Sequence, residues 1–239
     1  MTPDWTLKAM ILAAGRGQRM RPLTDHTPKP LLPINGQPLI AWHLQRLASA
    51  GISDVVINHA WLGQQIVDTL GDGRDFGVNI VYSAETTALE TAGGIARALP
   101  LLGTEPFLVI NGDIWCDWPL HQAIELASGL SRTNSLAHLV LVDNPDHHPQ
   151  GDFYLGANGQ VYGQPTDGES QTSLTFAGIG VYQPALFADL DPDQPAALGP
   201  LLRQAMHAGK IQGQHYMGNW LDVGTPQRLS QLASLLGRA

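Results

Sequence analysis

Short apolar runs alternate with stretches of helical periodicity along the first 142 residues of the chain. The apolar runs predict buried strands over 9–12, 54–58, 78–82, 106–110 and 136–142. Apolar residues spaced along one helix face predict helices over 38–50, 61–70, 91–99 and 120–130. Strands and helices that alternate in this order favour an α/β fold, with a mostly parallel sheet covered by helices on both faces.

The pattern changes after residue 142. Two short apolar runs flank Asn158-Gly159 and predict a β-hairpin over 153–155 and 160–162. We expect a further strand over 174–182, helices over 184–190 and 196–208, a short strand or extended stretch over 214–221, and a last helix. Thr225 suits the N-cap of that helix and Pro226 its first position. We therefore expect one domain over 1–239, with a core at about 8–142 and 196–239 and an antiparallel lid at about 143–195.

Composition narrows the class of protein. A hydrophobic content of 44% supports a sizeable core, and a net charge of −8 argues against a nucleic-acid partner. The one cysteine, Cys116, allows no intramolecular disulfide, and we expect a buried thiol rather than a nucleophile. The sequence shows no signal peptide and no apolar run of bilayer length, so we expect no membrane partner. We expect a soluble, cytoplasmic protein, either a monomer or a small homo-oligomer.

The loop after the first strand concentrates positive charge. It holds Arg16, Arg19, Arg21 and Lys29 against a single acid, Asp25. Two glycines in the same loop let the backbone approach a ligand, and fixed cations meet phosphate charge. The residues after the second glycine match neither a P-loop nor a dinucleotide fingerprint. We interpret the segment as another kind of phosphate-binding loop; for any single arginine, a solvated surface position is the alternative.

Two aspartates follow later apolar stretches. Asp113 ends Asn111-Gly112-Asp113 after a predicted strand, and Asp222 lies beside Val223-Gly224. Two carboxylates from distant segments suit Mg²⁺, which binds few protein carboxylates together with substrate phosphates. For either one alone, a turn or a helix cap is the alternative. The nine histidines lack zinc-site spacing, and the loop around His147 is a candidate rim for a polar substrate.

Together these segments resemble a known family. Leu12-Ala13-Ala14-Gly15-x-Gly17-x-Arg19-Met20-x-Pro22-Leu23-Thr24, followed by Pro28-Lys29-Pro30, resembles the signature of the sugar-1-phosphate nucleotidylyltransferases. Asn111-Gly112-Asp113, Ala177-Gly178-Ile179 and Trp220-x-Asp222-Val223-Gly224-Thr225-Pro226 resemble later motifs of that family, in the same order. The resemblance implies a Rossmann-like (GT-A-like) three-layer fold with a small antiparallel lid on the sugar side. It also implies the reaction of a nucleoside triphosphate with a sugar 1-phosphate, giving a nucleotide sugar and pyrophosphate.

The resemblance also implies roles for individual residues. Arg19 would hold the departing β,γ-phosphates, Lys29 the α-phosphate under attack, and Asp113 and Asp222 a Mg²⁺ ion. We expect the nucleotide to contact Leu12, Ala13, Ala14, Gly15, Gly17, Gln18, Glu85, Thr91, Ala92 and Gly93. We expect the sugar to contact Asn111, Asn144, Gly151, Asp152 and Trp220. Stretch 90–94, Glu-Thr-Ala-Gly-Gly, resembles the Leu-Gly-Thr-Ala-Gly stretch with which guanylyltransferase members contact the base.

Substrate choice depends on finer features. Within the family the chain most resembles members that use UTP and N-acetylmuramate 1-phosphate to make UDP-N-acetylmuramate (UDP-MurNAc) in cell-wall recycling. Many members have Glu-Lys-Pro where this chain has Gly163-Gln164-Pro165, and an asparagine where it has Phe176. Losing that lysine is compatible with a sugar that has its own carboxylate. The alternatives are a mannose-1-phosphate guanylyltransferase, a glucose-1-phosphate nucleotidylyltransferase, and a non-catalytic nucleotide-sugar sensor. We expect no left-handed β-helix acyltransferase domain.

Overall fold

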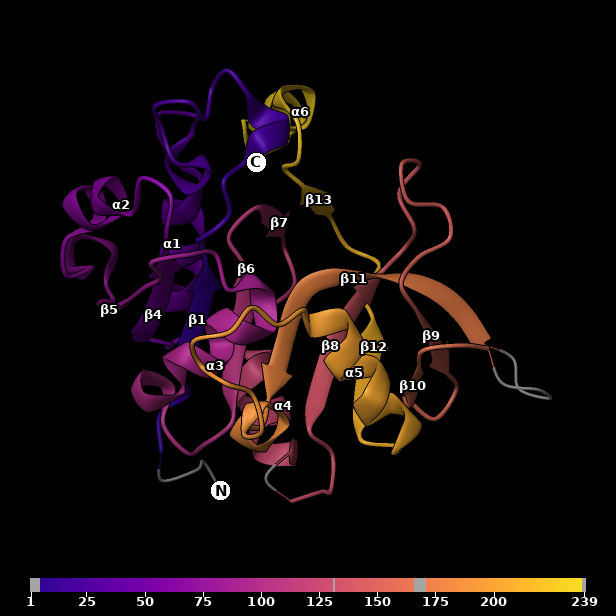
Figure 1. The fold of residues 1–239 in the computed structure, drawn as a ribbon. Helices are drawn as coiled ribbons and strands as arrows, with labels where there is room; N and C mark the ends of the chain where they lie inside the picture. The colour runs from indigo at the N-terminus through magenta and orange to yellow at the C-terminus, as the bar shows by residue number, and fades with distance from the viewer. Residues whose placement is uncertain (1–4, 131, 166–170, 238–239) are drawn as a thin grey trace.

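The centre of the molecule is a parallel sheet. The computed structural model describes residues 5–130, 132–165 and 171–237. Four strands form the parallel centre in the order β6-β1-β4-β5 (Figure 1): β1 (Ala9–Leu12), β4 (Asp54–His59), β5 (Asn79–Ala84) and β6 (Phe107–Asn111). Each coincides with a predicted strand to within two residues. Leu12 lies opposite both Asn58 and Asn111, so the carboxyl ends of three strands meet at one edge.

One long strand joins this centre to the second half of the chain. β11 (Gln171–Tyr182) runs antiparallel between β6 and β8 (Ala137–Val142), and β12 (Ile211–His215) lies parallel to β8. The first residues of β11, 171–174, pair instead with the predicted hairpin, β9 (Phe153–Gly156) and β10 (Val161–Tyr162). β11 therefore connects the main sheet and the hairpin in one continuous mixed sheet (Figure 1).

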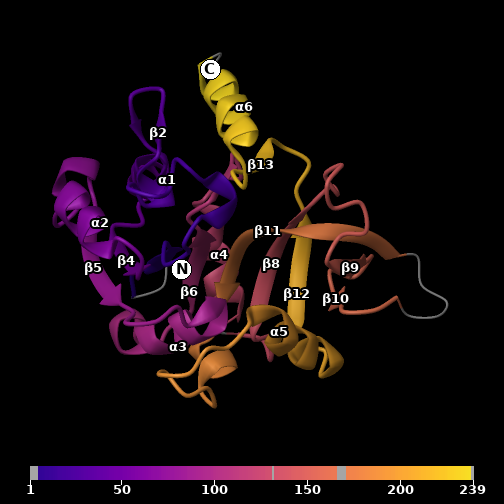
Figure 2. The same ribbon diagram turned by 45° about the horizontal axis from the view of Figure 1, so that its top comes forward.

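Helices cover both faces of the sheet. Consecutive strand residues point to opposite faces, so Ile11 and Ile110 pack in one core cluster, while Met10 and Val109 pack in the other. The first face packs against α1 (Leu39–Ser49), α2 (Gly63–Leu70) and α4 (Gln122–Leu130). The opposite face packs against α3 (Glu90–Leu102) and α5 (Leu198–His207), which lie along one side of the sheet in Figure 2. The predicted three-layer α/β fold is confirmed.

A third core cluster ties the chain's end to its beginning. α6 (Pro226–Leu236) contributes Leu232, which packs with Met20, Leu39 and Val223. Figure 1 accordingly shows α6 beside the first segments of the chain. Thr225 accepts a hydrogen bond from the backbone of Arg228, so the predicted N-cap is confirmed. The small elements nearby are β2 (Pro33–Ile34), β3 (Gln37–Pro38), β7 (Ile114–Cys116), β13 (Trp220–Asp222) and the 3₁₀ helices η1 (Gln18–Met20) and η2 (Lys29–Leu31).

One predicted element was wrong in kind. The helix expected over 184–190 is only a 3₁₀ helix, η4 (Pro184–Phe187), because the segment is too short to bury a full helical face. The short strand or extended stretch expected over 214–221 overlaps the end of β12 and the start of β13, two strands that pair with different partners. The sequence pattern also missed the short pairs β2-β3 and β7-β13. Over the described ranges, none of the helices has the length and apolar character to cross a bilayer.

Candidate active site

A cleft of about 510 Å³ opens at the carboxyl ends of β1 and β6. Because these strands are neighbours, the loop after Leu12 faces the turn after Asn111. Of the residues predicted for the nucleotide, catalysis and metal binding, the cleft is lined by Leu12, Ala13, Ala14, Gly15, Gly17, Gln18, Arg19, Lys29, Glu85, Thr91 and Asp113. The structure therefore gathers segments from positions 12 to 113 at one place.

The glycine loop is closed tightly on itself. Gly17 adopts φ 61°, in the left-handed region that glycine tolerates best. A Cβ at this position would lie 2.9 Å from Cγ2 of Thr24, whose hydroxyl donates a hydrogen bond of 2.8 Å to the Gly17 carbonyl. Both effects keep a larger residue out. The loop thus presents its backbone and Arg19 to the cleft in one fixed arrangement.

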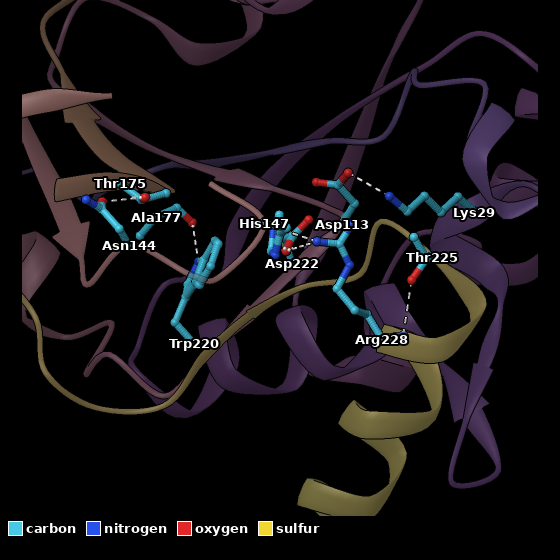
Figure 3. Close-up of polar contacts among 10 residues, drawn as sticks. All are labelled: Lys29, Asp113, Asn144, His147, Thr175, Ala177, Trp220, Asp222, Thr225 and Arg228. Carbon is cyan, nitrogen blue, oxygen red and sulfur yellow. Dashed lines mark hydrogen bonds and ion pairs between the residues drawn. The ribbon is translucent and has the colours of Figure 1, made fainter. Parts of the chain in front are cut away.

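Lys29 and Asp113 form an ion pair inside the cleft, with Nζ 2.7 Å from Oδ2 (Figure 3). Lys29 is only 8% exposed because Pro28 and Pro30 hold its backbone against the loop. The Asp113 side chain is 43% exposed and open to the cleft. A buried, fixed cation beside an accessible carboxylate can serve both a phosphate and a metal ion.

The pairing of β13 with β7 sets Asp222 beside the Asp113 turn, although Asp222 itself is not among the residues that line the cleft. Asp222 lies opposite Ile114, and the Val223 amide donates to the Asp113 carbonyl at 2.7 Å. Asp222 Oδ1 accepts from Nη1 of Arg228 at 2.7 Å and lies 3.1 Å from Nε2 of His147 (Figure 3). Of the two predicted metal ligands, Asp113 therefore lies in the turn just before β7 and Asp222 in β13, and each has a basic partner.

These residues fit a magnesium ion better than a metal held by protein alone. Over the described parts of the chain, no three His, Cys, Asp or Glu side chains gather as a ligand set. Mg²⁺ takes one or two protein carboxylates and completes its shell with water and phosphate oxygens. Asp113 and Asp222 supply that minimal donor set. The cations of the glycine loop are then available to bind phosphate oxygens.

A buried polar network fixes the floor of the cleft. Asn58, at the end of β4, accepts a hydrogen bond from the Ala13 amide at 2.8 Å and donates to Glu85 at 2.6 Å. The second oxygen of Glu85 accepts from the Leu89 amide at 3.0 Å. Glu85 is 6% exposed, so its carboxylate ties the glycine loop to the start of α3. Sequence reasoning missed Asn58, although a polar residue ending an apolar strand was an available signal.

At the start of α3 the predicted nucleotide contacts separate. Thr91 lines the cleft, whereas the amides of Ala92 and Gly93 donate to the Ala196 carbonyl at 2.9 and 3.1 Å. The structure therefore places those two residues under the cleft rather than at its surface. Glu90 adopts φ 57°, a left-handed conformation unusual for a residue with a side chain.

A second cleft, of about 420 Å³, adjoins the first and shares Glu90, Thr91 and Asn111 with it. Of the residues predicted for the sugar, Asn111 and Asp152 line this second cleft. The other three lie outside both linings. Asn144 accepts from Thr175 at 2.9 Å, and Trp220 donates to Ala177 at 2.9 Å (Figure 3). A Cβ at Gly151 would lie 2.5 Å from the Asn144 side-chain oxygen.

Two buried ionisable groups, Cys116 and His43, are neutral at neutral pH. Cys116 lies in β7, and burial raises the pKa of its thiol to about 11, which suits the predicted buried thiol. Burial and the nearby Arg46 lower the pKa of His43 to about 4, so this ring is uncharged at neutral pH. Neither group acts as a nucleophile or base here.

Sequence reasoning missed two basic residues: Arg203, which lines the second cleft, and Arg228, which pairs with Asp222. Arg228 sits on the predicted last helix and Arg203 on the predicted helix over 196–208. An arginine on an amphipathic helix normally faces solvent, so the sequence held no signal that could single them out.

Comparison with known proteins fits this geometry. The family model described as nucleotidyl transferase matches residues 8–238. An N-acetylmuramate alpha-1-phosphate uridylyltransferase from Neisseria meningitidis serogroup B is 54% identical, over 97% of this chain and 99% of the relative. Another from Caulobacter vibrioides is 34% identical over 92% of each chain. The crystal structure of HddC from Yersinia pseudotuberculosis complexed with GMP-PN shares the fold, with a TM-score of 0.79, 20% identity, and coverage of 97% of this chain and 100% of that chain. With a family match over nearly its whole length, this chain belongs to the nucleotidyl transferase family of enzymes.

Proposed function

We propose that this chain transfers the uridylyl group of UTP to N-acetylmuramate 1-phosphate, in the cytoplasm and with Mg²⁺, giving UDP-MurNAc and pyrophosphate. The observation that supports the proposal most is the Lys29–Asp113 pair in a cleft formed by a cationic glycine loop. The choice of UTP and N-acetylmuramate 1-phosphate rests on the names of the relatives at 54% and 34% identity.

The reaction needs no protein nucleophile. An oxygen of the sugar phosphate attacks the α-phosphorus of UTP, and the bond from that phosphorus to the β-phosphate bridging oxygen breaks. Pyrophosphate leaves with the bonding electron pair. The attacking phosphate is already ionised near neutral pH, so no general base is required. Catalysis in such transfers comes from positioning and from cations that neutralise developing negative charge.

The residues of the first cleft supply those two effects. We assign Lys29 to the α-phosphate. Its buried stem restricts the side chain to one position, so the ammonium loses little conformational freedom when the phosphate binds. We assign Arg19 to the departing phosphates. We assign the backbone at Ala13 to the nucleotide, because hydrogen bonds through Asn58 and Glu85 fix the position of that backbone.

Asp113 and Asp222 are the residues that would hold Mg²⁺. Bound there, the ion supplies polarisation of the phosphate oxygens. In the structure the same carboxylates pair with Lys29 and Arg228. Those pairs hold the two carboxylates in place next to the loop to which we assign the phosphates.

A crossed activity screen tests the proposal. The purified chain is incubated with each of four nucleoside triphosphates and with the 1-phosphates of N-acetylmuramate, N-acetylglucosamine, glucose and mannose, and pyrophosphate is measured. We expect release with UTP and N-acetylmuramate 1-phosphate, loss of release in EDTA, and recovery with excess Mg²⁺. Activity confined to GTP and mannose 1-phosphate would contradict the assignment. Nucleotide-sugar binding without release in any mixture would identify a sensor instead.

A further inference from the structure

The second cleft contains an arginine without an acidic partner. Arg203, from α5, lines this cleft, and its guanidinium carbon lies 5.3 Å from the ring centroid of Phe153. Asp152 lines the same cleft, but its oxygens accept from the Phe176 amide at 2.8 Å and face His148 at 3.1 Å. In the parts of the chain that the structure describes, no carboxylate forms an ion pair with Arg203. Its charge is left for a ligand.

The surrounding backbone makes room for this side chain. A Cβ at Gly163 would lie 3.1 Å from Cγ of Arg203, and a Cβ at Gly199 would lie 3.2 Å from its Nη1. Both distances are tighter than ordinary van der Waals contact. Arg203 is an exposed residue, but the two glycines leave space for its stem and guanidinium, and the Phe153 ring lies against its charged end at the rim of the cleft.

Its position separates Arg203 from the transferred phosphate. Arg19, Lys29 and Asp113 line the first cleft and not the second, whereas Arg203 lines the second and not the first. The clefts meet at Asn111. A sugar whose phosphate reaches Lys29 therefore extends past Asn111 toward Arg203.

The second cleft also has an apolar wall. Phe176, Leu198 and Leu202 line it beside the guanidinium. N-Acetylmuramate differs from N-acetylglucosamine by a lactyl ether, which adds one carboxylate and one methyl group. A single guanidinium next to apolar side chains matches that pair of groups.

We propose that Arg203 binds the lactyl carboxylate of the sugar and thereby selects N-acetylmuramate 1-phosphate over N-acetylglucosamine 1-phosphate. This assignment rests on the proposed function. A charge-assisted hydrogen bond contributes enough that its loss weakens binding of the acidic sugar about 10- to 100-fold. The sugar that lacks the carboxylate loses nothing when the guanidinium is removed.

The test compares two proteins, wild type and Arg203→Met, on two sugar phosphates. Arg203→Met keeps an unbranched stem over Phe153 and removes the charge. For wild type and variant, we measure the KM for N-acetylmuramate 1-phosphate, the inhibition constant of N-acetylglucosamine 1-phosphate as its competitor, and the KM for UTP. We expect the first to rise about 10- to 100-fold in the variant, and the other two to stay within about 2-fold. Retained inhibition and UTP binding show that the variant is folded.

A second variant and a control sharpen the result. Gly163→Ala leaves the guanidinium in the chain but intrudes on its stem, so it should raise the same KM in the same direction. Arg74→Met removes an exposed arginine that pairs with Asp72 on a loop outside both clefts and should change nothing.

Three outcomes would overturn the assignment. Equal weakening of both sugars would place Arg203 at the shared phosphate, and unchanged constants would make it an ordinary surface residue. Loss of UTP binding in Arg203→Met would assign it to the nucleotide. Failure of the proposed function is distinct from all three, because there the wild type itself releases no pyrophosphate from UTP and N-acetylmuramate 1-phosphate.

Discussion

At the scale of single residues, two ion pairs lie at and beside the first cleft. Lys29 faces Asp113 and Arg228 faces Asp222, with nitrogen–oxygen distances of 2.7 Å in both cases. Side chains already held in place by partners lose little further freedom when substrate binds. Lys29, Asp113 and Asp222 are thus held by partners before any substrate binds.

Glu90 is the residue where the backbone departs most from ordinary preference at the site. Glu90 has a side chain but adopts φ 57°, in the left-handed region that glycine tolerates best. Glu90→Gly should therefore raise the free energy of unfolding by about 1 kcal/mol, because glycine adopts that conformation freely. Urea denaturation measures it. Glu105→Gly, in an exposed turn, is the control and should not stabilise; an equal or lower stability of Glu90→Gly would contradict the account.

His43 makes stability depend on pH. Its pKa is about 4 when folded and near 6.5 when exposed, so below pH 6.5 the unfolded chain binds a proton that the folded chain does not. The unfolding free energy is therefore unaffected by this ring above pH 6.5 and falls as the pH drops toward 4. By pH 5 the loss amounts to about 2 kcal/mol. His43→Leu should therefore lose less stability than wild type between pH 7.5 and pH 5.0 in urea denaturation, the two conditions we choose. Identical losses would show that the ring is not the group responsible.

Residues differ in how far the sequence could predict them. Lys29 and Asp113 could be predicted because their neighbours in the chain, two prolines and a glycine after an apolar strand, already indicate their setting. Arg203 could not, because its role depends on Gly163 and Phe153, which come from other elements. Local sequence describes a residue's backbone well, but it does not show which distant side chains surround it.

At the scale of elements, the short pair β7-β13 does more for the site than its length suggests. It sets Asp222 next to the Asp113 turn through the hydrogen bond from Val223. Strands of three residues bury too little to leave a periodic pattern, so hydrophobic spacing could not predict them. The long, fully buried strands of the sheet gave clear patterns and were predicted.

The N-cap of α6 supports that pair from the other side. Thr225 accepts from the Arg228 amide, and Arg228 in turn binds Asp222. Thr225→Ala should lower the free energy of unfolding by about 1 kcal/mol, because it leaves a helix N–H without its partner. Thermal or urea denaturation gives the value. Ser234→Ala, later in the same helix, is the matched control with an expected change within about 0.5 kcal/mol, and equal effects of the two variants would deny the cap its role.

At the scale of the whole molecule, the sheet provides two adjacent clefts, to which we assign separate tasks. The parallel half, β6-β1-β4-β5, ends at the cleft that we assign to the nucleotide. The hairpin β9-β10 and helix α5 supply Phe153 and Arg203 to the cleft that we assign to the sugar. β11 belongs to both parts, so the two clefts are held in a fixed relation by one continuous strand.

We propose that this protein transfers a uridylyl group at the cleft that contains Lys29 and Asp113. Pyrophosphate release from UTP, N-acetylmuramate 1-phosphate and Mg²⁺, measured side by side for wild type, Lys29→Ala and the control Lys210→Ala, tests it most directly. Lys210 lies outside both clefts. We predict rapid release by wild type and Lys210→Ala, and a rate about 10²- to 10³-fold lower for Lys29→Ala, as for loss of other electrostatic stabilisers. Near wild-type turnover by Lys29→Ala would contradict the account.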